Sequence, residues 1–536
     1  MTPSRAGARH VGERSRSGLY LTAGLLAFCL AFAQSPASRA ARQPPAGIQE
    51  QPNIVVFQTD DQALSQFSSA VMPKVTELLA TRGTQFDHAY LTTPECCPSR
   101  ATLLTGQYGH NNGVLSNSYS LLQDKRNVLP VWLSRAGYVT AHVGKFLNAY
   151  HLHRKPLAPA PGWTQWVTLV RPGRYYDYDL SVNGRKFHYG DKPRDYSTQV
   201  FDRAAIRMIR RYVPRNRPLY LQMDEVAPHV ETGTSLPPPQ CNPIPAPGDE
   251  GLFSNATLPH PPSFDEADMS DKPAFMQTLP RLTNQNVDFM TRNYRCGLAA
   301  LRAVDRSVGR VFREINRLGE LRRTVFMFYT DNGTFYGEHR IPLGKVDPYE
   351  EAVSTPLIMR VPERYLGGRP PVAHVSEPVA NIDFAPTILS LAGAEPCRRE
   401  GVCRTMDGRS MTPLISGRAP AWTTDRPIGV EIDLPVGVSK HPACEYTGVR
   451  VGGQVLINYL RAKAFGADGC VPDNEWERYN LTNDPFELRN LCFGGDYANC
   501  PHDQSGQELQ SVLTRIRYCA GVAGRDPQTE GRPYCG

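Results

Sequence analysis

The stretch Asn53–Thr59 (NIVVFQT), followed at once by Asp60–Asp61, decides the fold class of this 536-residue chain. It is short, mostly apolar and rich in β-branched residues, which is typical of a strand buried in a parallel sheet. A second such run, Thr324–Tyr329 (TVFMFY), ends in Thr330 and then Asp331–Asn332. In open α/β sheets, ligands bind at the carboxyl ends of the strands. Two strands ending in carboxylate and amide side chains therefore predict a site at that edge.

A third buried strand is predicted at Leu219–Met223 (LYLQM), before Asp224 and, further on, Ala227-Pro228-His229. Helical stretches are expected at Pro73–Arg82 and Ile382–Leu391, and the first is stopped by a glycine. Strands that alternate with helices indicate an α/β fold, a large parallel or mixed sheet flanked by helices on both faces. We expect this domain to span residues 53–418.

The chain changes character from about residue 419, where it becomes rich in cysteine. Strand-like runs such as Val449–Tyr459 and a helical segment at Gln507–Arg517 follow. We predict a smaller α+β domain with an antiparallel sheet over residues 419–536.

Composition and charge exclude several classes of protein. Apolar residues make up 40% of the chain and charged residues 21%, ordinary values for a folded, water-soluble protein. The net charge is +7, but the first forty residues hold five arginines against the single acidic residue Glu13, so the remainder carries only +3. A nucleic-acid-binding protein would concentrate positive charge on one face, and we expect no nucleic-acid partner.

The N-terminus has the pattern of an export signal. A basic segment, Arg5–Arg16, precedes an apolar run, Leu19–Ala33, and small residues then offer cleavage after Ala33 or Ala40. We predict a signal peptide at 1–40, a linker at 41–52, a secreted or periplasmic location, and no stable membrane insertion after cleavage. An uncleaved anchor or a buried helix are the alternatives.

Export would place the cysteines where they can form disulfides. Of thirteen, Cys29 would leave with the signal and Cys96–Cys97 form an adjacent pair, which leaves ten. An even set in an oxidising compartment predicts up to five disulfides. The spacing favours local loops such as Cys397–Cys403 and Cys492–Cys500, although the sequence leaves the connectivity open.

The segment from Cys96 to Gly106 (CCPSRATLLTG) carries the most specific signal in the chain. It resembles the signature of the sulfatase family, C-x-P-x-R followed by a conserved extension. In that family the first cysteine is oxidised to formylglycine (3-oxoalanine) by a separate formylglycine-generating maturation enzyme. The resemblance implies that Cys96 is modified and that Cys97 occupies the variable position.

The resemblance extends over nearly the whole mature chain and implies an alkaline-phosphatase-like fold. Segments that carry it include Gly144–Asn148 (GKFLN), Ala227–His229 (APH), Gly337–His339 (GEH) with Lys345, and Arg478–Leu481 (RYNL). The GKFLN segment and the paired cysteines are most similar to N-acetylglucosamine-6-sulfatases and related arylsulfatases.

The residue types at the strand ends support a metal site independently of the resemblance. Hard divalent cations prefer oxygen ligands, which Asp60, Asp61, Asp331 and Asn332 supply. Taken alone, an Asp-Asp pair is more often a helix cap or turn. By the family pattern these four residues hold one Ca²⁺ close to modified Cys96, and Mg²⁺ is not excluded.

The remaining site residues neutralise and position an anion. A sulfate monoester resists attack by an anionic nucleophile, so the site must offer positive donors. The resemblance assigns Lys145, His229 and Lys345 to that role, and Arg100 could brace the hydroxyls of the modified residue. We also expect His110 and Asn148 to line the substrate pocket, although an ordinary loop histidine explains His110 equally well.

The mechanism implied by the family has two stages. The aldehyde at residue 96 is hydrated, and the metal makes one hydroxyl nucleophilic near neutral pH. It attacks sulfur, and His229 or Lys345 protonates the leaving alcohol. A covalent sulfate stays on residue 96 until the second hydroxyl loses its proton and expels it. Some sulfatases carry Lys-x-His here, whereas this chain has Leu147 at the histidine position.

The leading hypothesis is thus a secreted sulfatase acting on sulfate monoesters of small molecules or carbohydrates. One alternative is a formylglycine-dependent phosphonate monoester or phosphodiester hydrolase of the same superfamily. Another class would be a non-catalytic secreted binding protein on a sulfatase scaffold, which the complete set of site residues disfavours. A disulfide oxidoreductase using Cys96–Cys97 fits poorly because the pair lacks C-x-x-C spacing.

Overall fold

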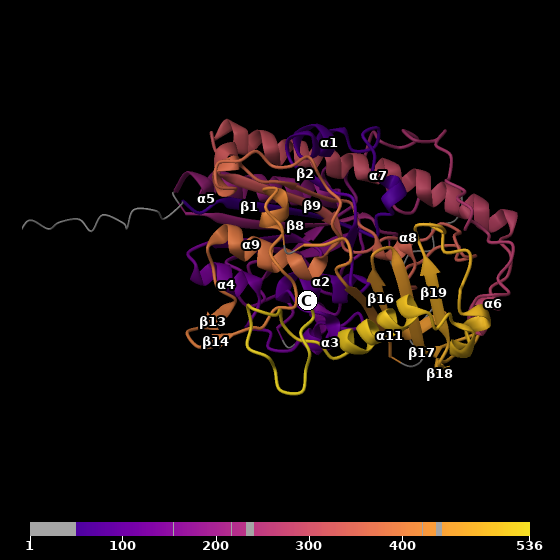
Figure 1. Cartoon of the computed structure of the whole chain (residues 1–536). Coiled ribbons are helices and arrows are strands. Elements are labelled where there is room, and N and C mark those ends of the chain that lie inside the picture. Colours follow the sequence, from indigo (N-terminus) through magenta and orange to yellow (C-terminus); the bar gives the residue numbers. More distant parts are fainter. Residues whose placement is uncertain (1–49, 154, 216, 232–240, 421, 436–441) are drawn as a thin grey trace, which may run out of the picture. The chain divides into compact units, whose positions relative to one another are not determined.

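A ten-stranded mixed sheet organises the larger part of the chain (Figure 1). The computed structural model describes residues 50–153, 155–215, 217–231, 241–420, 422–435 and 442–536. The predicted signal peptide and most of the linker lie outside the described residues. The strand order is β11-β2-β10-β9-β1-β8-β4-β5-β6-β7. The strands are β1 (Asn53–Asp60), β2 (Thr84–Phe86), β4 (Val139–Gly144), β5 (Gln165–Leu169), β6 (Tyr178–Val182), β7 (Arg185–Tyr189), β8 (Leu219–Pro228), β9 (Thr324–Thr330), β10 (Leu357–Arg360) and β11 (His374–Val375).

The centre of the sheet is parallel and places the site. Strand β1 pairs in parallel with β9 on one side and with β8 on the other, and β8 continues to β4. All three strands predicted from the sequence are present and buried along their whole length. Because β1, β9, β8 and β4 run the same way, their carboxyl ends meet at one edge. The predicted α/β class is confirmed.

Helices cover both faces of the sheet (Figure 1). On one face, Val55 and Phe57 of β1 share a hydrophobic cluster with side chains from α1, α5 and α7. On the other, Ile54 and Val56 pack with side chains from α2, α4 and α9. This alternation is the two-residue period of a strand. The helices are α1 (Pro73–Leu78), α2 (Cys96–Thr105), α3 (Gly109–Asn112), α4 (Leu129–Arg135), α5 (Ser197–Tyr212), α6 (Ala274–Gln277), α7 (Asn284–Arg317), α8 (Glu350–Val353), α9 (Phe384–Ala392), α10 (Thr412–Ile415) and α11 (Gln504–Ile516).

A second, antiparallel sheet follows in the C-terminal part. It comprises β15 (Ile428–Asp433), β16 (Ala443–Val451), β17 (Gln454–Ala462), β18 (Val471–Pro472) and β19 (Trp476–Asn480), in the order β15-β16-β17-β18 with β19 also against β17. The predicted run Val449–Tyr459 is two strands, because Gly452 and Gly453 form a turn with positive φ that reverses the chain. Short pairs complete the strands: β3 (Ala89–Tyr90) with β12 (Val379–Ala380), and β13 (Cys397–Arg399) with β14 (Val402–Cys403).

The C-terminal sheet is packed on both faces. Leu509 and Leu513 of α11 join the cluster on one face. On the other, Ile457 and Tyr459 share a cluster with Phe335 and Tyr349, from the segment after β9. The sheet therefore supports the loop that carries Lys345. The predicted domain boundary at residue 418 stays a prediction.

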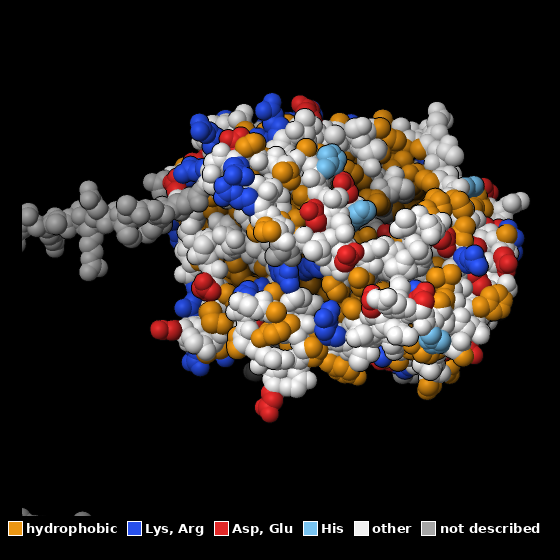
Figure 2. Space-filling model, in the orientation of Figure 1, with side chains coloured by type: hydrophobic (Ala, Val, Ile, Leu, Met, Phe, Trp, Pro, Cys, Tyr) orange, Lys and Arg blue, Asp and Glu red, His pale blue; other side chains and the backbone are white. Residues whose placement is uncertain are grey.

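Five disulfides join the ten predicted cysteines among the described residues. They are Cys241–Cys296, Cys397–Cys403, Cys444–Cys470, Cys492–Cys500 and Cys519–Cys535, which confirms both pairs expected from spacing. Cys96 and Cys97 are free and buried. Within the described ranges, no helix combines the length and apolar character that crossing a membrane requires. Figure 2 shows acidic and basic side chains interspersed on the visible face.

Candidate active site

Cys96 is the first residue of α2, and its side chain points toward the carboxyl edge of the sheet. The preceding residue, Glu95, is extended, and the helix ends at Gly106, whose φ of 66° closes it with a left-handed turn. All ten residues of α2 are buried, so the helix packs tightly within the protein. Burial raises the pKa of the Cys96 thiol to about 12, despite two neighbouring lysines. An unmodified thiol here would stay protonated and be a poor nucleophile.

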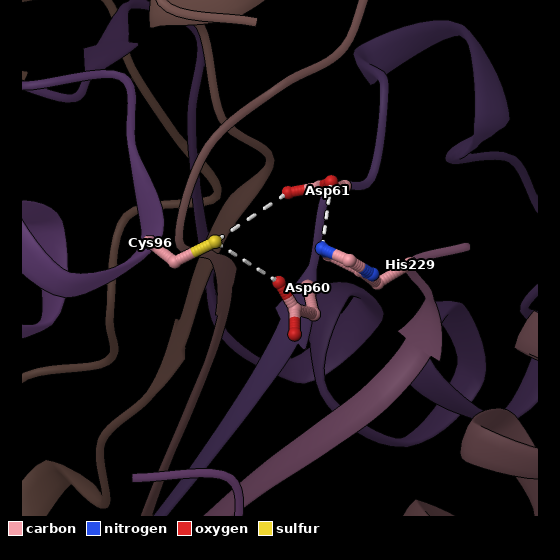
Figure 3. Close-up of side chains that lie close together, drawn as sticks. All are labelled: Asp60, Asp61, Cys96 and His229. Carbon is pink, nitrogen blue, oxygen red and sulfur yellow. Dashed lines mark hydrogen bonds and ion pairs between the residues drawn. The ribbon is translucent and has the colours of Figure 1, made fainter. Parts of the chain in front are cut away.

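Asp60 ends strand β1 and Asp61 follows it, and both lie beside that sulfur (Figure 3). The Cys96 Sγ lies 3.7 Å from Asp60 Oδ1 and 4.0 Å from Asp61 Oδ1. The pairing of β1 with β8 shifts register just before Asp60, and Asp61 has a φ of 62°. This left-handed turn breaks the strand's alternation, so both carboxylates face the same site. Aspartate tolerates that conformation better than most residues.

Two lysines approach the sulfur from different parts of the chain. Lys145, directly after β4, places its Nζ 3.4 Å from Cys96 Sγ and 2.5 Å from Asp60 Oδ2. Lys345, in the loop after β9, places its Nζ 2.7 Å from the sulfur and 2.5 Å from Asp61 Oδ1. Each lysine is thus paired with one aspartate.

The charges of these pairs stabilise one another. Burial alone would raise the pKa of Asp60 and of Asp61, but the ammonium of the paired lysine and nearby cations lower both below the ordinary value. Burial opposes charge on the lysines too, yet the carboxylates raise the pKa of Lys145 and of Lys345. The site therefore holds ionised carboxylates and positive donors together.

His229 follows β8, whose last residue is Pro228, so the strand runs past Met223, the end expected from sequence. Its Nε2 lies 3.5 Å from Asp61 Oδ2, and its Nδ1 donates to the carbonyl oxygen of Val230 at 2.5 Å. Burial lowers the pKa of the imidazole. Ligand atoms of Asp60, Asp61, Cys96 and His229 lie within 4.8 Å of one another (Figure 3).

Arg100 lies one turn along α2 and joins the two strand ends. Its Nε and Nη2 reach Asp331 Oδ2 at 2.8 and 2.7 Å, and its Nη1 donates to the carbonyl oxygen of Lys145. The backbone N–H of Asp61 donates to Asp331 Oδ1. Burial, then the charge of Asp60, raise the pKa of Asp331 to about 6. The predicted contact of Arg100 with the modified residue 96 stays a prediction.

The hydrogen bonding of the Asn332 side chain bears on whether the predicted ligands suit a hard cation. Its Nδ2 donates to Asp61 Oδ1 at 2.6 Å, whereas its Oδ1, although buried, has no hydrogen-bond donor among the described residues. A buried carbonyl oxygen without a donor is unfavourable unless a further group binds it. An amide oxygen and carboxylate oxygens, as Asn332, Asp60, Asp61 and Asp331 offer, are the donor types that Ca²⁺ or Mg²⁺ prefers. The residues therefore fit such an ion.

The two residues predicted to line the substrate pocket differ in their surroundings. Both ring nitrogens of His110 face protein acceptors: Nδ1 faces Glu431 at 2.8 Å and Nε2 the carbonyl oxygen of Cys519 at 3.1 Å. This arrangement favours the loop-histidine alternative. The carbonyl oxygen of Asn148 accepts from the N–H of Tyr119, which anchors its loop, and its buried Oδ1 has no donor in the described part of the chain.

Sequence reasoning missed three supporting residues. Glu95 precedes Cys96, accepts from Asn117 at 2.6 Å, and has its pKa raised to about 7 by burial. Asp224 lies 3.8 Å from Arg100 and accepts from His142 at 2.9 Å if that nitrogen carries the proton. Asp224 directly follows a predicted strand, the same signal that identified Asp60 and Asp331. His142 lies inside a strand, where the sequence offers no such signal.

A cavity of about 730 Å³ opens onto the site. It is lined on the catalytic side by Asp61, His229 and Lys345. Lys463 and Phe465, from the loop after β17 of the C-terminal sheet, also line it. Both parts of the chain thus contribute to the walls. The sulfur, the paired charges and this cavity define a site built to hold an anion next to a metal-binding carboxylate cluster.

Two models of known protein families match the chain. The model described as Sulfatase matches residues 52–394, and the model of the N-sulphoglucosamine sulphohydrolase C-terminal region matches residues 337–516. The chain belongs to the sulfatase family.

Similar proteins span several lineages. The chain is 28% identical over 508 residues to human N-acetylglucosamine-6-sulfatase, covering 89% of this chain and 86% of that protein. It is 37% identical over 378 residues to an arylsulfatase of Volvox carteri, covering 65% and 56%. It is 33% identical over 392 residues to the extracellular sulfatase SULF-1 homologue of Drosophila melanogaster, covering 71% and 33%. The chain thus spans a third to about half the length of the latter two.

Solved structures share the fold. One is a protein in complex with its substrate, D-glucosamine-2-N,6-O-disulfate, with a TM-score of 0.68, 24% identity, and coverage of 87% of this chain and 97% of the other. Another is the phosphonate monoester hydrolase of Agrobacterium radiobacter, with a TM-score of 0.63, 18% identity and coverage of 90% and 99%. At these identities the likeness shows that the fold is shared.

Proposed function

We propose that this protein hydrolyses sulfate monoesters, with residue 96 at the reacting centre. One observation carries the proposal: Cys96 Sγ lies within 4.0 Å of two carboxylates and two ammonium groups, at the head of a buried helix. A sulfate ester has to be held by positive donors while a nucleophile is placed in line with sulfur. The two lysines supply the positive donors, and residue 96 lies where a nucleophile formed from it would meet the anion.

Two groups that the family implies would complete the chemistry. Ca²⁺, held by oxygens of Asp60, Asp61, Asp331 and Asn332, would supply Lewis acidity, and formylglycine made from Cys96 would supply the attacking hydroxyl. Lys145 is held by its ion pair with Asp60 and neutralises negative charge at residue 96. From the cavity side, Lys345 donates a hydrogen bond at the same atom and can hold the proton for the departing alcohol. His229, on the same wall, is the other candidate for that proton.

We infer that the substrate is a sulfated carbohydrate. The side chain of Phe465 is 61% exposed at the cavity and offers an apolar face to a sugar ring, and Lys463 offers a second cation. The similarity to N-acetylglucosamine-6-sulfatases supports this substrate class. Lys463→Met is expected to raise KM more for a disulfated glucosamine than for a monosulfated one, because only the former has a second anionic group.

We also propose that the protein is exported. Five disulfides among the described residues are expected in an oxidising compartment, and the Arg5–Ala40 sequence has the features of a cleaved signal. N-terminal sequencing of the protein from culture medium or periplasm would locate the mature end near residue 34 or 41.

The decisive experiment combines mass and rate. The full chain is produced with and without a formylglycine-generating enzyme, and the peptide carrying residues 96–100 is weighed. Conversion of Cys96 alone, together with sulfate release that Cys96→Ala abolishes, is the expected result. Faster turnover of a phosphonate monoester than of a sulfate ester would favour the alternative hydrolase. Full conversion without turnover of either ester would favour the non-catalytic binding protein.

A further inference from the structure

A second group of metal-ligating side chains lies outside the proposed catalytic set. It consists of His339 in the loop after β9, Glu351 in α8, and Glu487 after β19. One ligand atom from each lies within 4.8 Å of the others. Nothing in the catalytic proposal uses these three residues.

The spacing of the ligand atoms suits a shared ion better than direct contact. His339 Nε2 and Glu351 Oε2 are 3.9 Å apart, too far for a hydrogen bond. Ligands around a tetrahedral Zn²⁺, each at about 2.1 Å from the metal, lie about 3.4 Å from one another. Small side-chain movements would bring the three atoms onto one ion.

The atoms that face the group are buried and have no hydrogen-bond partner among the described residues. These atoms are His339 Nε2, Glu351 Oε2 and Glu487 Oε1. His339 is fully buried and Glu487 is 1% exposed. A buried polar atom without a partner is costly, and three that converge call for a common ligand.

The other ring nitrogen of His339 is held as in metal sites. Its Nδ1 lies 2.7 Å from Glu266 Oε2, and a hydrogen bond there requires the proton on Nδ1 because a carboxylate only accepts. The lone pair is then left on Nε2, which points into the group. Histidines that bind metals almost always donate their second N–H in this way, often to a carboxylate. The imidazole is therefore oriented and in the tautomer that a metal needs.

The local charge also favours a cation. Glu266, Glu351 and Glu487 surround the imidazole, and two buried cations face them: Lys272, 3.6 Å from Glu266 Oε1, and Arg450, whose charge acts on Glu487. Lys272 Nζ also donates to Tyr479 Oη at 2.8 Å and to the backbone carbonyl oxygen of Glu487.

We propose that His339, Glu351 and Glu487 form a structural site for a divalent transition metal, for which Zn²⁺ is the best match. An imidazole nitrogen combined with carboxylate oxygens favours such an ion over Ca²⁺. Bound there, the ion ties the loop that carries Lys345 to the segment after β19. It would therefore fasten the C-terminal sheet to the catalytic part without touching the substrate.

Zinc content of the full-length protein tests the site. Because the group of Asp61 and Cys96 could itself take zinc, the test uses the Cys96→Ser/Asp61→Asn protein as background. After loading with ZnCl₂ and desalting, this protein is expected to retain about one zinc per chain by mass spectrometry of the metal. Adding His339→Gln or Glu487→Gln should lower the content at least about tenfold.

Controls keep the test decisive. His110→Gln, which removes a partly buried histidine from outside both groups, should keep the zinc of the background protein. X-ray absorption of the background protein should show imidazole and carboxylate ligands, so the result stands even where a variant fails to fold. No zinc in the folded background protein, or zinc unaffected by His339→Gln, would overturn the proposal and leave the carboxyls satisfied by protons.

Discussion

Replacing Lys345 with methionine separates its catalytic contribution from its structural one. The substitution keeps the length and the apolar stem and removes the ammonium group. In the structure that group lies 2.7 Å from the sulfur of Cys96 and 2.5 Å from Asp61 Oδ1, with 12% of the side chain exposed to the cavity. It is therefore placed to donate to charge that develops at residue 96.

The expected loss of rate follows from that position. Removing one preorganised donor from a site of developing charge costs roughly 10²–10³ in kcat, or about 3–4 kcal/mol. The loss of stability should be smaller, because Asp61 keeps the hydrogen bond from Asn332 at 2.6 Å. We expect Lys345→Met to lower kcat/KM by roughly two to three decades while its unfolding free energy falls by less than about 2 kcal/mol.

Arg100→Met is the informative comparison. The Arg100 side chain is 1% exposed and makes two contacts to Asp331, so its removal leaves a buried carboxylate without its cation. Breaking such a pair costs about 3–5 kcal/mol. Arg100→Met should thus lose both activity and stability, whereas Lys345→Met loses mainly activity.

The assay measures kcat and KM on 4-nitrophenyl sulfate with fully converted protein, and urea unfolding on the same samples. Lys74→Met, at an exposed lysine paired with Glu77, is the control for loss of a positive charge. The reasoning is refuted if Lys345→Met stays within about threefold of the unmodified kcat/KM, or if it destabilises the protein as much as Arg100→Met.

Three further predictions concern the scaffold. Arg426 donates two hydrogen bonds to fully buried Asp383, so Arg426→Met should lower the unfolding free energy by about 3–5 kcal/mol, measured in urea. Against burial, Glu431 raises the pKa of His110 to about 9, above the unfolded value near 6.5. This protonation should add up to about 3 kcal/mol to the unfolding free energy, a contribution fully present below pH 6.5 and lost as pH rises through 9. The prediction is wrong if His110→Gln leaves the fall in unfolding free energy between pH 6 and 10 unchanged. Gly144 has a φ of 111°, and a Cβ there would lie 1.9 Å from a carbonyl oxygen of β8, so Gly144→Ala should sharply reduce both soluble yield and sulfate release, whereas Gly137→Ala, with open space around it, should be milder.

Much of the central sheet could be predicted from sequence because its strands are buried on both faces. Asn53–Thr59, Leu219–Met223 and Thr324–Tyr329 are continuous apolar runs, and all three form neighbouring parallel strands. The ends of the strands were harder to predict. Strand β8 continues through polar Asp224 to Pro228 because it pairs with β1 there. Local composition does not contain that pairing.

The candidate site was also predicted in outline. Asp60, Cys96, Lys145 and Lys345 were each identified from motifs, and the structure brings all four together. Their pairing was not predictable, because which lysine neutralises which aspartate depends on loops that meet only in the folded chain. Nor was the second group, in which His339 and Glu487 are separated by nearly 150 residues.

The sequence by itself determined the family, the α/β class and the main residues of the candidate site, because motifs and hydrophobic runs are local properties of the chain. Only the tertiary structure decided how the charges balance. Burial raises the pKa of Asp331, and the folded chain brings His110 to Glu431 and His339 to Glu351 and the distant Glu487. Electrostatic energy depends on separation in space and on the surrounding dielectric, and neither is written in the order of residues.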